Sequence, residues 1–418
     1  MHETSELSAS YNPMMNPDRD DPFARYCKLR AEAPVAFVPA FNLWLVSRYD
    51  DLLAVLRDRE AFSTEGSTSF IAQAAPEVAQ ILIDAEVDRP AVLTDPPAIH
   101  ARRRMMIGKV FTPKRIAALE PAIRVIAEAY VAKFAAAGQV EFMDAFAYPV
   151  PIAVLSNFLG IPSEHIELMW QGGIALRVLM GEPAPLEQQH AHAATILKLR
   201  GVLAQLIDER RKHPADDVLS ALVAAQDDEG AGFTTGDLIR LCLTLAVAGH
   251  FTTTHFLGNL VKLALQDGTT WQRFVDDRNL SSKVVEEALR AEGSLRGMFR
   301  RTTRAVELGG ATIPAGALVQ ILFGSANRDE TTFPEPDRFD IDRESTAPHL
   351  AFGRGIHYCI GAALARLQAK VSLEVLAEQL PNLRLKPGSD IPYNPNIWAW
   401  GPDACHLEWD LPTAAGEK

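Results

Sequence analysis

One cysteine-bearing turn constrains this chain more than any other stretch of its sequence. Cys359 lies among three glycines in the run Phe352-Gly353-Arg354-Gly355-Ile356-His357-Tyr358-Cys359-Ile360-Gly361, and a helix-like segment follows at once. Free backbone N–H groups and the positive end of a helix dipole stabilise a thiolate in that position. Glycines also let the backbone approach a flat partner closely. The cysteine is therefore either an ordinary buried thiol or an axial ligand for the metal of a flat cofactor.

The composition excludes several classes of protein. The chain has 418 residues, 48% of them hydrophobic, which is ample for a large core. Its formal net charge of −12 argues against general nucleic-acid binding. The four cysteines are scattered without a C-x-x-C pair, which is typical of reduced thiols in a cytoplasmic protein. The sequence shows no apolar leader and no apolar stretch of about 20 residues, so we expect no membrane anchor.

The order of the predicted elements indicates a mainly helical fold with a smaller β region. Residues 1–21 are polar, and we expect a flexible N-terminus followed by a single domain over residues 22–418. The patterning predicts one long helix from about Thr235 to Gln266 and a last helix from about Gly361 to Leu380. Short strand-like pieces follow Val306, with glycine- and proline-bearing turns between them.

The complete F-G-x-G-x-H-x-C-x-G string resembles the haem-binding signature of the cytochromes P-450, and every fixed position matches. The resemblance implies the fold of that family, with haem b buried between the long central helix and the cysteine loop. Cys359 is then the axial iron ligand, and Phe352, Gly353 and Gly361 help to hold the cofactor. It also implies that the protein uses dioxygen and external reducing equivalents.

A second match is the pair Glu287 and Arg290, three residues apart on one predicted helix face. Taken alone, such a pair is typical of a solvated surface. The pair matches the E-x-x-R helix of the family, and Arg338 matches its later arginine. The resemblance implies a buried network of Glu287, Arg290 and Arg338 behind the haem.

Four cationic side chains are expected to hold the haem propionates. His100 and Arg104 lie one turn apart on a predicted helix and match the H-x-x-x-R motif of the family. His357 and Arg300 match its other propionate partners, and Arg301 is an adjacent alternative to Arg300. We expect the neighbouring Arg102 and Arg103 to be exposed.

The central helix carries Ala248-Gly249-His250-Phe251-Thr252, which resembles the oxygen-activating A-G-x-[acid]-T segment of the family. The resemblance implies that Gly249 leaves space for dioxygen and that Thr252 hydrogen-bonds it. The acid position is Phe251, which cannot pass a proton. His250 is therefore a candidate proton donor, because an imidazole titrates near neutral pH. The alternative is that ordered water delivers the proton and His250 only packs.

The substrate pocket is expected along several segments that line it in the family, including the loop from Ser67 to Ile83. Its large side chains suit a flat polycyclic substrate, although each one taken alone is more typical of ordinary core. A carboxylate of the substrate is the expected partner of Arg296. The candidate lining residues are Phe70, Met180, Leu245, Ala246, Arg296, Met298, Phe299, Trp398 and Trp400.

The His250-Phe251-Thr252 segment also resembles that of family members which couple bis-indoles such as chromopyrrolic acid in indolocarbazole biosynthesis. That resemblance implies intramolecular aryl–aryl C–C bond formation without oxygen insertion. The alternative is a conventional monooxygenase that hydroxylates or epoxidises another secondary metabolite. A peroxide-driven enzyme and a non-catalytic binding domain are less consistent with the retained Thr252 and Cys359.

The chain shows no flavin- or iron–sulfur-binding segment, so we expect electrons from a separate ferredoxin and ferredoxin reductase. A basic patch that includes Arg354 and Arg103 would steer an acidic ferredoxin. The protein is expected to be a cytoplasmic monomer.

Overall fold

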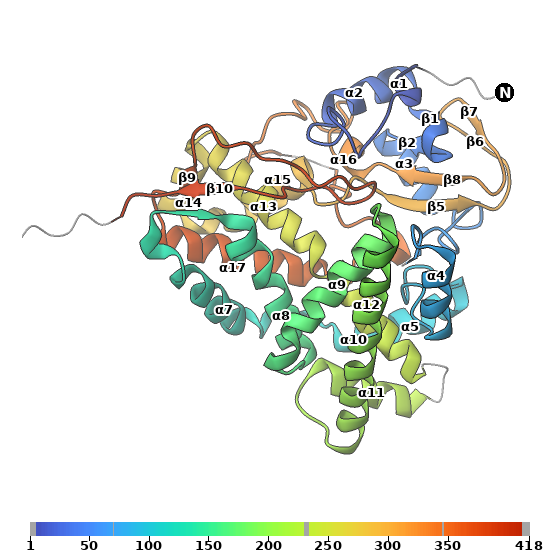
Figure 1. Cartoon of the computed structure of the whole chain (residues 1–418). Coiled ribbons are helices and arrows are strands. Elements are labelled where there is room, and N and C mark those ends of the chain that lie inside the picture. The colour runs from blue at the N-terminus through green and yellow to red at the C-terminus, as the bar shows by residue number, and fades with distance from the viewer. Residues whose placement is uncertain (1–5, 70, 230–233, 345–346, 412–418) are drawn as a thin grey trace, which may run out of the picture.

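The computed structural model describes residues 6–69, 71–229, 234–344 and 347–411. Helices dominate, and they gather on one side of the molecule, while the largest sheet and the N-terminal helices lie on the other (Figure 1). The helices of eight or more residues are α2 (Phe23–Glu32), α3 (Tyr49–Arg57), α4 (Pro76–Asp84), α5 (Pro97–Val110), α7 (Glu120–Ala132), α8 (Pro149–Leu159), α9 (Ile166–Gly181), α10 (Leu186–Lys212), α11 (Val218–Glu229), α12 (Thr235–Ala248), α13 (Phe251–Gln266), α14 (Thr269–Asp276), α15 (Ser281–Glu292) and α17 (Ala362–Gln379).

A five-stranded sheet has the order β1-β2-β8-β5-β3, with β2 and β8 parallel and the other neighbours antiparallel. Its strands are β1 (Val35–Val38), β2 (Leu43–Val46), β8 (Leu318–Ile321), β5 (Met298–Thr302) and β3 (Phe62–Ser63). A three-stranded sheet joins β4 (Gln139–Glu141), β10 (His406–Glu408) and β9 (Arg384–Leu385), and a hairpin joins β6 (Val306–Leu308) and β7 (Ala311–Ile313). The mainly helical prediction with a smaller β region is therefore confirmed.

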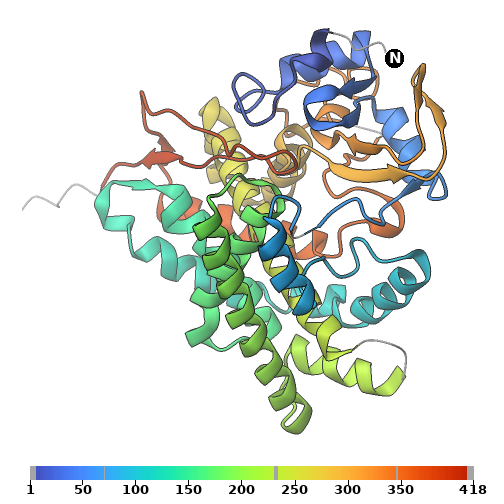
Figure 2. The ribbon, with the colours of Figure 1, turned by 45° about the vertical axis from the view of Figure 1, so that its right-hand side comes forward.

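The predicted long helix is two consecutive helices, α12 and α13, with a break at Gly249 and His250. A capping box fixes the start of α12, because the Thr234 and Asp237 side chains each accept a hydrogen bond from the other residue's backbone N–H. α13 packs against α15 and α17, and both α12 and α13 are almost completely buried. The turned view shows this pair running through the middle of the helical part (Figure 2). The break therefore lies deep in the protein.

The N-terminal residues differ from the prediction. Residues 6–21 pack onto the core: Tyr11 is only 1% exposed, and Asp18 is buried as well. The guanidinium of Arg296, also buried, donates to the carbonyl oxygens of Pro13, Asp18 and Arg19. The prediction of a flexible segment up to Asp21 is therefore wrong from Glu6 onward. In the part of the chain that the structure describes, no helix combines the length and the apolar character needed to cross a membrane.

Candidate functional site

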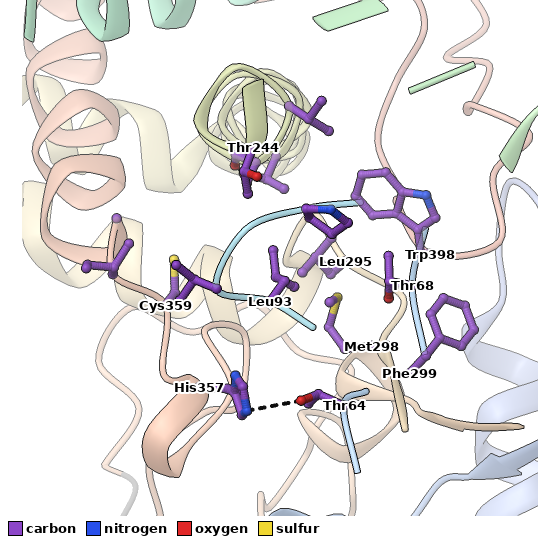
Figure 3. A pocket seen from close by; sticks show the side chains of 18 of the residues that line it. Thr64, Thr68, Leu93, Thr244, Leu295, Met298, Phe299, His357, Cys359 and Trp398 are labelled. Atoms are coloured by element: carbon purple, nitrogen blue, oxygen red, sulfur yellow. Dashed lines mark hydrogen bonds between the residues drawn. The ribbon is translucent and has the colours of Figure 1, made fainter. Parts of the chain in front are cut away.

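A cavity of about 580 Å³ lies between the cysteine loop and the broken central helix. The loop from Phe352 to Gly361 forms one wall with the start of α17, and the cavity-facing sides of α12 and α13 form another. Figure 3 shows Cys359 and His357 on one side of this space and Thr244 of α12 on the other. Aromatic and apolar side chains, among them Phe299 and Trp398, complete the lining.

Cys359 lines the cavity, and it is deep in the molecule although its surface is open to that space. Burial raises the pKa of its thiol above the ordinary value. The backbone N–H groups of Gly361 and Ala362 and the charges of Arg104 and Arg366 act in the opposite direction without outweighing burial. The helix start alone therefore does not produce a thiolate here, whereas coordination to a metal deprotonates a thiol outright.

Gly249 and Thr252 both face the cavity, as predicted from the sequence. A Cβ atom at position 249 would lie 2.9 Å from the carbonyl oxygen of Leu245, so a larger residue would crowd this turn of the helix. The hydroxyl of Thr252 donates to the carbonyl oxygen of Ala248 at 2.6 Å. Its oxygen lone pairs remain available to a group in the cavity.

His250 does not face the cavity, so the prediction that it donates protons there is not supported by its position. The ring is fully buried, and Nε2 lies 2.9 Å from the carbonyl oxygen of Tyr148. Because a carbonyl only accepts, Nε2 carries the proton. Burial lowers the pKa of His250 to about 4, so the ring is neutral near neutral pH. Its role in the structure is to fasten the helix break to the start of α8.

The four predicted cationic residues, His100, Arg104, Arg300 and His357, all line the cavity and lie near one another. The rings of His100 and His357 are 4.2 Å apart between centroids, and Arg104 donates to the carbonyl oxygen of Tyr358. Burial lowers the pKa of Arg300 to about 10. Among the described residues, neither Arg104 nor Arg300 has a carboxylate partner, and the buried Nε2 of His100 has no hydrogen-bond partner.

Two arginines without a carboxylate partner and one unpartnered histidine nitrogen fit haem b. Its two carboxylates would supply the anionic acceptors that Arg104, Arg300 and His100 lack. Cys359 would supply the sulfur ligand of the iron, and Gly249 at the helix break leaves room in the same cavity. A helical fold with a cysteine loop, a broken central helix and this cationic group defines a haem-thiolate protein.

Comparisons with known proteins agree. The cytochrome P450 family model matches residues 261–397. Cytochrome P450 107B1 of Saccharopolyspora erythraea is 37% identical over 391 residues, which covers 89% of this chain and 92% of that protein. The mycinamicin IV hydroxylase/epoxidase of Micromonospora griseorubida is 34% identical over 395 residues, covering 92% of this chain and 95% of that protein.

One solved structure, an intact type IV self-sufficient cytochrome P450 monooxygenase, superposes with a TM-score of 0.92 at 31% identity. The match covers 97% of this chain and 54% of that one, so this chain spans about half of its length. The chain belongs to the cytochrome P450 family. Members of this family are haem-thiolate enzymes that use dioxygen and external reducing equivalents.

The structural network differs from the prediction in one member. Glu287 and Arg290 are buried and paired at 2.7 Å, but the side chain of Arg338 is 62% exposed and contacts Glu335 and Asp340. Arg343 takes the predicted place, because its Nε lies 3.1 Å from Glu287 Oε1 and its side chain is only 9% exposed. Arg338 contributes only its carbonyl oxygen, which accepts from Arg290.

The predicted pocket residues divide into two groups. Met180, Leu245, Met298, Phe299 and Trp398 line the cavity. Ala246, Arg296 and Trp400 do not, and Phe70 lies outside the described residues.

The three misplaced pocket residues each face the protein interior. Arg296 donates only to backbone carbonyls, including that of Asn396 at 3.0 Å. Trp400 stacks on Tyr393, with 4.5 Å between ring centroids. Ala246 is fully buried on the side of α12 that packs near Gly173 of α9.

Several lining residues were not singled out from the sequence, among them Thr64, Leu93 and Thr244. Thr64 belongs to the loop before α4 and lies 3.5 Å from His357 between Oγ1 and Nε2 (Figure 3). Leu93 follows Asp88-Arg89-Pro90, where no motif or period marks it. Thr244 lies four residues before Ala248 and eight before Thr252, and only this helical spacing could have indicated that it faces the cavity.

Of the two arginines predicted to form a basic docking patch, Arg354 and Arg103, only Arg354 is exposed. Arg103 is buried, with Nη1 2.7 Å from Asp95 and Nη2 2.6 Å from Asp237. Its charge is therefore used inside the protein, and the expectation that it is exposed is wrong. Arg354 is exposed on the cysteine loop.

Proposed function

We propose that this chain is a monooxygenase that inserts oxygen into a largely apolar secondary metabolite. The observation that carries the proposal is the cavity itself, in which Cys359 faces Gly249 and Thr252 across a mainly apolar space. The mycinamicin IV hydroxylase/epoxidase among its relatives supports the same reaction class. Hydroxylation and epoxidation are the two expected outcomes.

Each part of the site has a role in this proposal. Haem b, when bound through Cys359, supplies the oxidation chemistry with dioxygen and two external electrons. Arg104, Arg300, His100 and His357 hold its carboxylates and fix its orientation. Thr252 offers a hydroxyl oxygen to the cavity because its hydrogen is committed to Ala248. The apolar walls exclude water from the substrate's reacting carbon.

Oxidative coupling of a bis-indole is a second candidate. Two observations favour it: the acid position holds Phe251, and Phe299 and Trp398 offer aromatic surface to a flat substrate. In this reaction two aryl C–H bonds break and one C–C bond forms, and the two protons and two electrons released, with two external electrons and two further protons, reduce dioxygen to two waters, so no oxygen enters the product. The position of His250, which faces away from the cavity, weakens the resemblance on which the candidate first rested.

Mass spectrometry of products distinguishes the two. Haem-loaded protein is given labelled dioxygen, a ferredoxin with its reductase, and a substrate panel that includes macrolides and chromopyrrolic acid. We expect a product heavier by one labelled oxygen. A product lighter by two hydrogens and free of label would overturn oxygen insertion in favour of coupling.

We infer further that a ferredoxin and ferredoxin reductase supply the electrons, and that the protein is a cytoplasmic monomer. Arg354 is exposed on the loop that carries Cys359, which supports docking of an acidic partner there. Reduction rates measured with ferredoxin at rising ionic strength test this: the rate of Arg354→Glu should be lower and less salt-dependent than that of the natural chain. Equal rates and salt dependence would refute the docking position.

A further inference from the structure

The turn at residues 90–95 contains a backbone conformation that a β-branched residue rarely adopts. Val92 has a φ of +70°, in the left-handed region where the Cβ of a valine is crowded. The N–H of Leu93 donates to the carbonyl oxygen of Ala91 at 2.8 Å, so the three residues form the rare, strained kind of γ-turn. Such strain persists only where surrounding contacts hold it, and it is concentrated at functional sites.

Two hydrogen bonds hold this turn from opposite sides. The N–H of Ala91 donates to Thr244 Oγ1 at 2.9 Å, and the Thr244 hydroxyl itself donates to the carbonyl oxygen of Arg240 at 2.7 Å. The threonine is therefore fixed in orientation on α12. The N–H of Val92 donates to Asp95 Oδ2 at 2.9 Å.

Asp95 is anchored in turn by Arg103. The guanidinium of Arg103 bridges Asp95 and Asp237, all three of which are buried. Because Arg103 belongs to α5 and Asp237 caps α12, the strained turn is tied to both helices. Breaking one of these buried pairs would leave a buried charge without a partner, which is strongly destabilising. The ion pairs of Arg103 therefore stay formed and keep the turn in place.

The held turn forms part of the cavity wall. Its residues Pro90, Ala91, Val92 and Leu93 all line the cavity, where Pro90 and Ala91 are buried and Val92 and Leu93 are half-buried. In the view of Figure 3, the Leu93 side chain lies between Cys359 and Met298.

We propose that the turn is a clamp that fixes Leu93 as a size-selecting residue of the cavity. Thr244 and Asp95 are its positioning residues, and Leu93 is the side chain that contacts the ligand. The clamp favours slim ligands, because Leu93 cannot withdraw while the turn is held. This inference deepens the proposed function and rests on it.

The test measures ligand binding to haem-loaded protein, without turnover. The probes are imidazole and the bulkier 4-phenylimidazole, titrated by the shift of the haem absorption band. We expect Leu93→Ala to raise the affinity for 4-phenylimidazole relative to imidazole by about tenfold. Thr244→Val, which keeps the side-chain volume but removes the acceptor, should shift the ratio in the same direction by about threefold. Asp95→Asn should do so as well.

Thr195→Val is the matched control. The Thr195 hydroxyl also donates to the carbonyl four residues earlier, Ala191, but it is exposed on α10. Its affinity ratio should equal that of the natural chain. In the double variant Leu93→Ala/Thr244→Val, the second change should add nothing, because the side chain that the clamp positions is gone.

An unchanged ratio in Leu93→Ala would overturn size selection. A changed ratio in Leu93→Ala with no change in either Thr244→Val or Asp95→Asn would overturn the clamp. A protein that shows a thiolate spectrum and these binding shifts, yet inserts no oxygen into any substrate, would instead contradict the proposed function alone.

Discussion

The ion cluster of Glu287 and Arg290 gives the sharpest test of the structure. The family motif names Arg338 as its second arginine, whereas the structure places Arg343 there. Arg343 places Nε 3.1 and 3.3 Å from the two carboxylate oxygens of Glu287. It also donates to the carbonyl oxygens of Glu335 and Arg338. The side chain of Arg338 lies outside the cluster. We therefore compare Arg343→Met with Arg338→Met.

The expected magnitudes follow from burial. Removing one partner of a buried, hydrogen-bonded pair costs about 3–5 kcal/mol, since it leaves a charge without compensation. The pairs of Arg338 are 3.3 and 3.8 Å long on a largely exposed side chain, and exposed pairs contribute about 0–1 kcal/mol. Arg343→Met should thus lower the free energy of unfolding by about 3 kcal/mol or more, and Arg338→Met by less than about 1 kcal/mol.

The cluster also reaches the cysteine loop. Arg290 donates to the carbonyl oxygen of Asn327 at 3.0 Å, and the Asn327 side chain accepts from the N–H of Leu350 at 2.6 Å. Loss of Arg343 should therefore lower haem content as well as stability. Urea unfolding and the carbon monoxide difference spectrum per mole of protein measure the two effects. If Arg338→Met proved as damaging as Arg343→Met in both assays, the assignment would be wrong.

Three further outcomes are expected. Arg296→Met removes the donor for the carbonyl oxygens of Pro13, Asp18, Arg19 and Asn396. Limited proteolysis should then cut the N-terminal residues faster, and the free energy of unfolding should fall by about 3 kcal/mol. Unchanged cleavage would refute the conclusion that Arg296 holds the N-terminal residues on the core. Burial lowers the pKa of His250 to about 4 and of His255 to about 3, whereas both have a pKa of about 6.5 in the unfolded chain. The free energy of unfolding, measured by urea titration, should therefore fall as the pH drops from about 6.5 towards 4, by about 2 kcal/mol per histidine at pH 5. A free energy of unfolding that does not change over this pH range would contradict the prediction. Thr252→Val should keep the haem yet lower product formed per electron by about tenfold or more, and full coupling would exclude the hydroxyl.

The central helix shows why a motif locates a site more reliably than it assigns each residue. Gly249 and Thr252 face the cavity as predicted, because the motif fixes which turn of the helix lies opposite the cysteine. His250 and Ala246 are four residues apart and share the opposite face, so helical periodicity excludes both once Gly249 and Thr252 are placed. The helical periodicity that separates these two faces can be read from the sequence, but the motif alone does not indicate which of its residues share a face.

The remaining errors concern contacts between segments distant in the sequence. The choice between Arg338 and Arg343 depends on how the residues around Glu335 fold back onto α15, and no local pattern encodes that. Arg296 finds its acceptors nearly 280 residues earlier in the chain, where polar residues alone predict flexibility. Helix positions and the cysteine signature are local properties, and these were predicted well.

The orientation of the helix break has a consequence for proton delivery. Phe251 packs away from the cavity, with the Arg177 guanidinium 4.9 Å from its ring centroid. An acid introduced as Phe251→Asp would therefore face Arg177 and compete with Glu182, which already pairs with that arginine. We expect this variant to gain no proton-donating function and to leave the coupling of electrons to product unchanged. On α12 and α13, the cavity-facing hydroxyl groups are those of Thr244, Thr252 and Thr253, and each donates its proton to the carbonyl oxygen four residues earlier. Thr252 therefore offers its oxygen to a group in the cavity as an acceptor, and a rise in coupling in Phe251→Asp would refute the expectation that position 251 is turned away from the cavity.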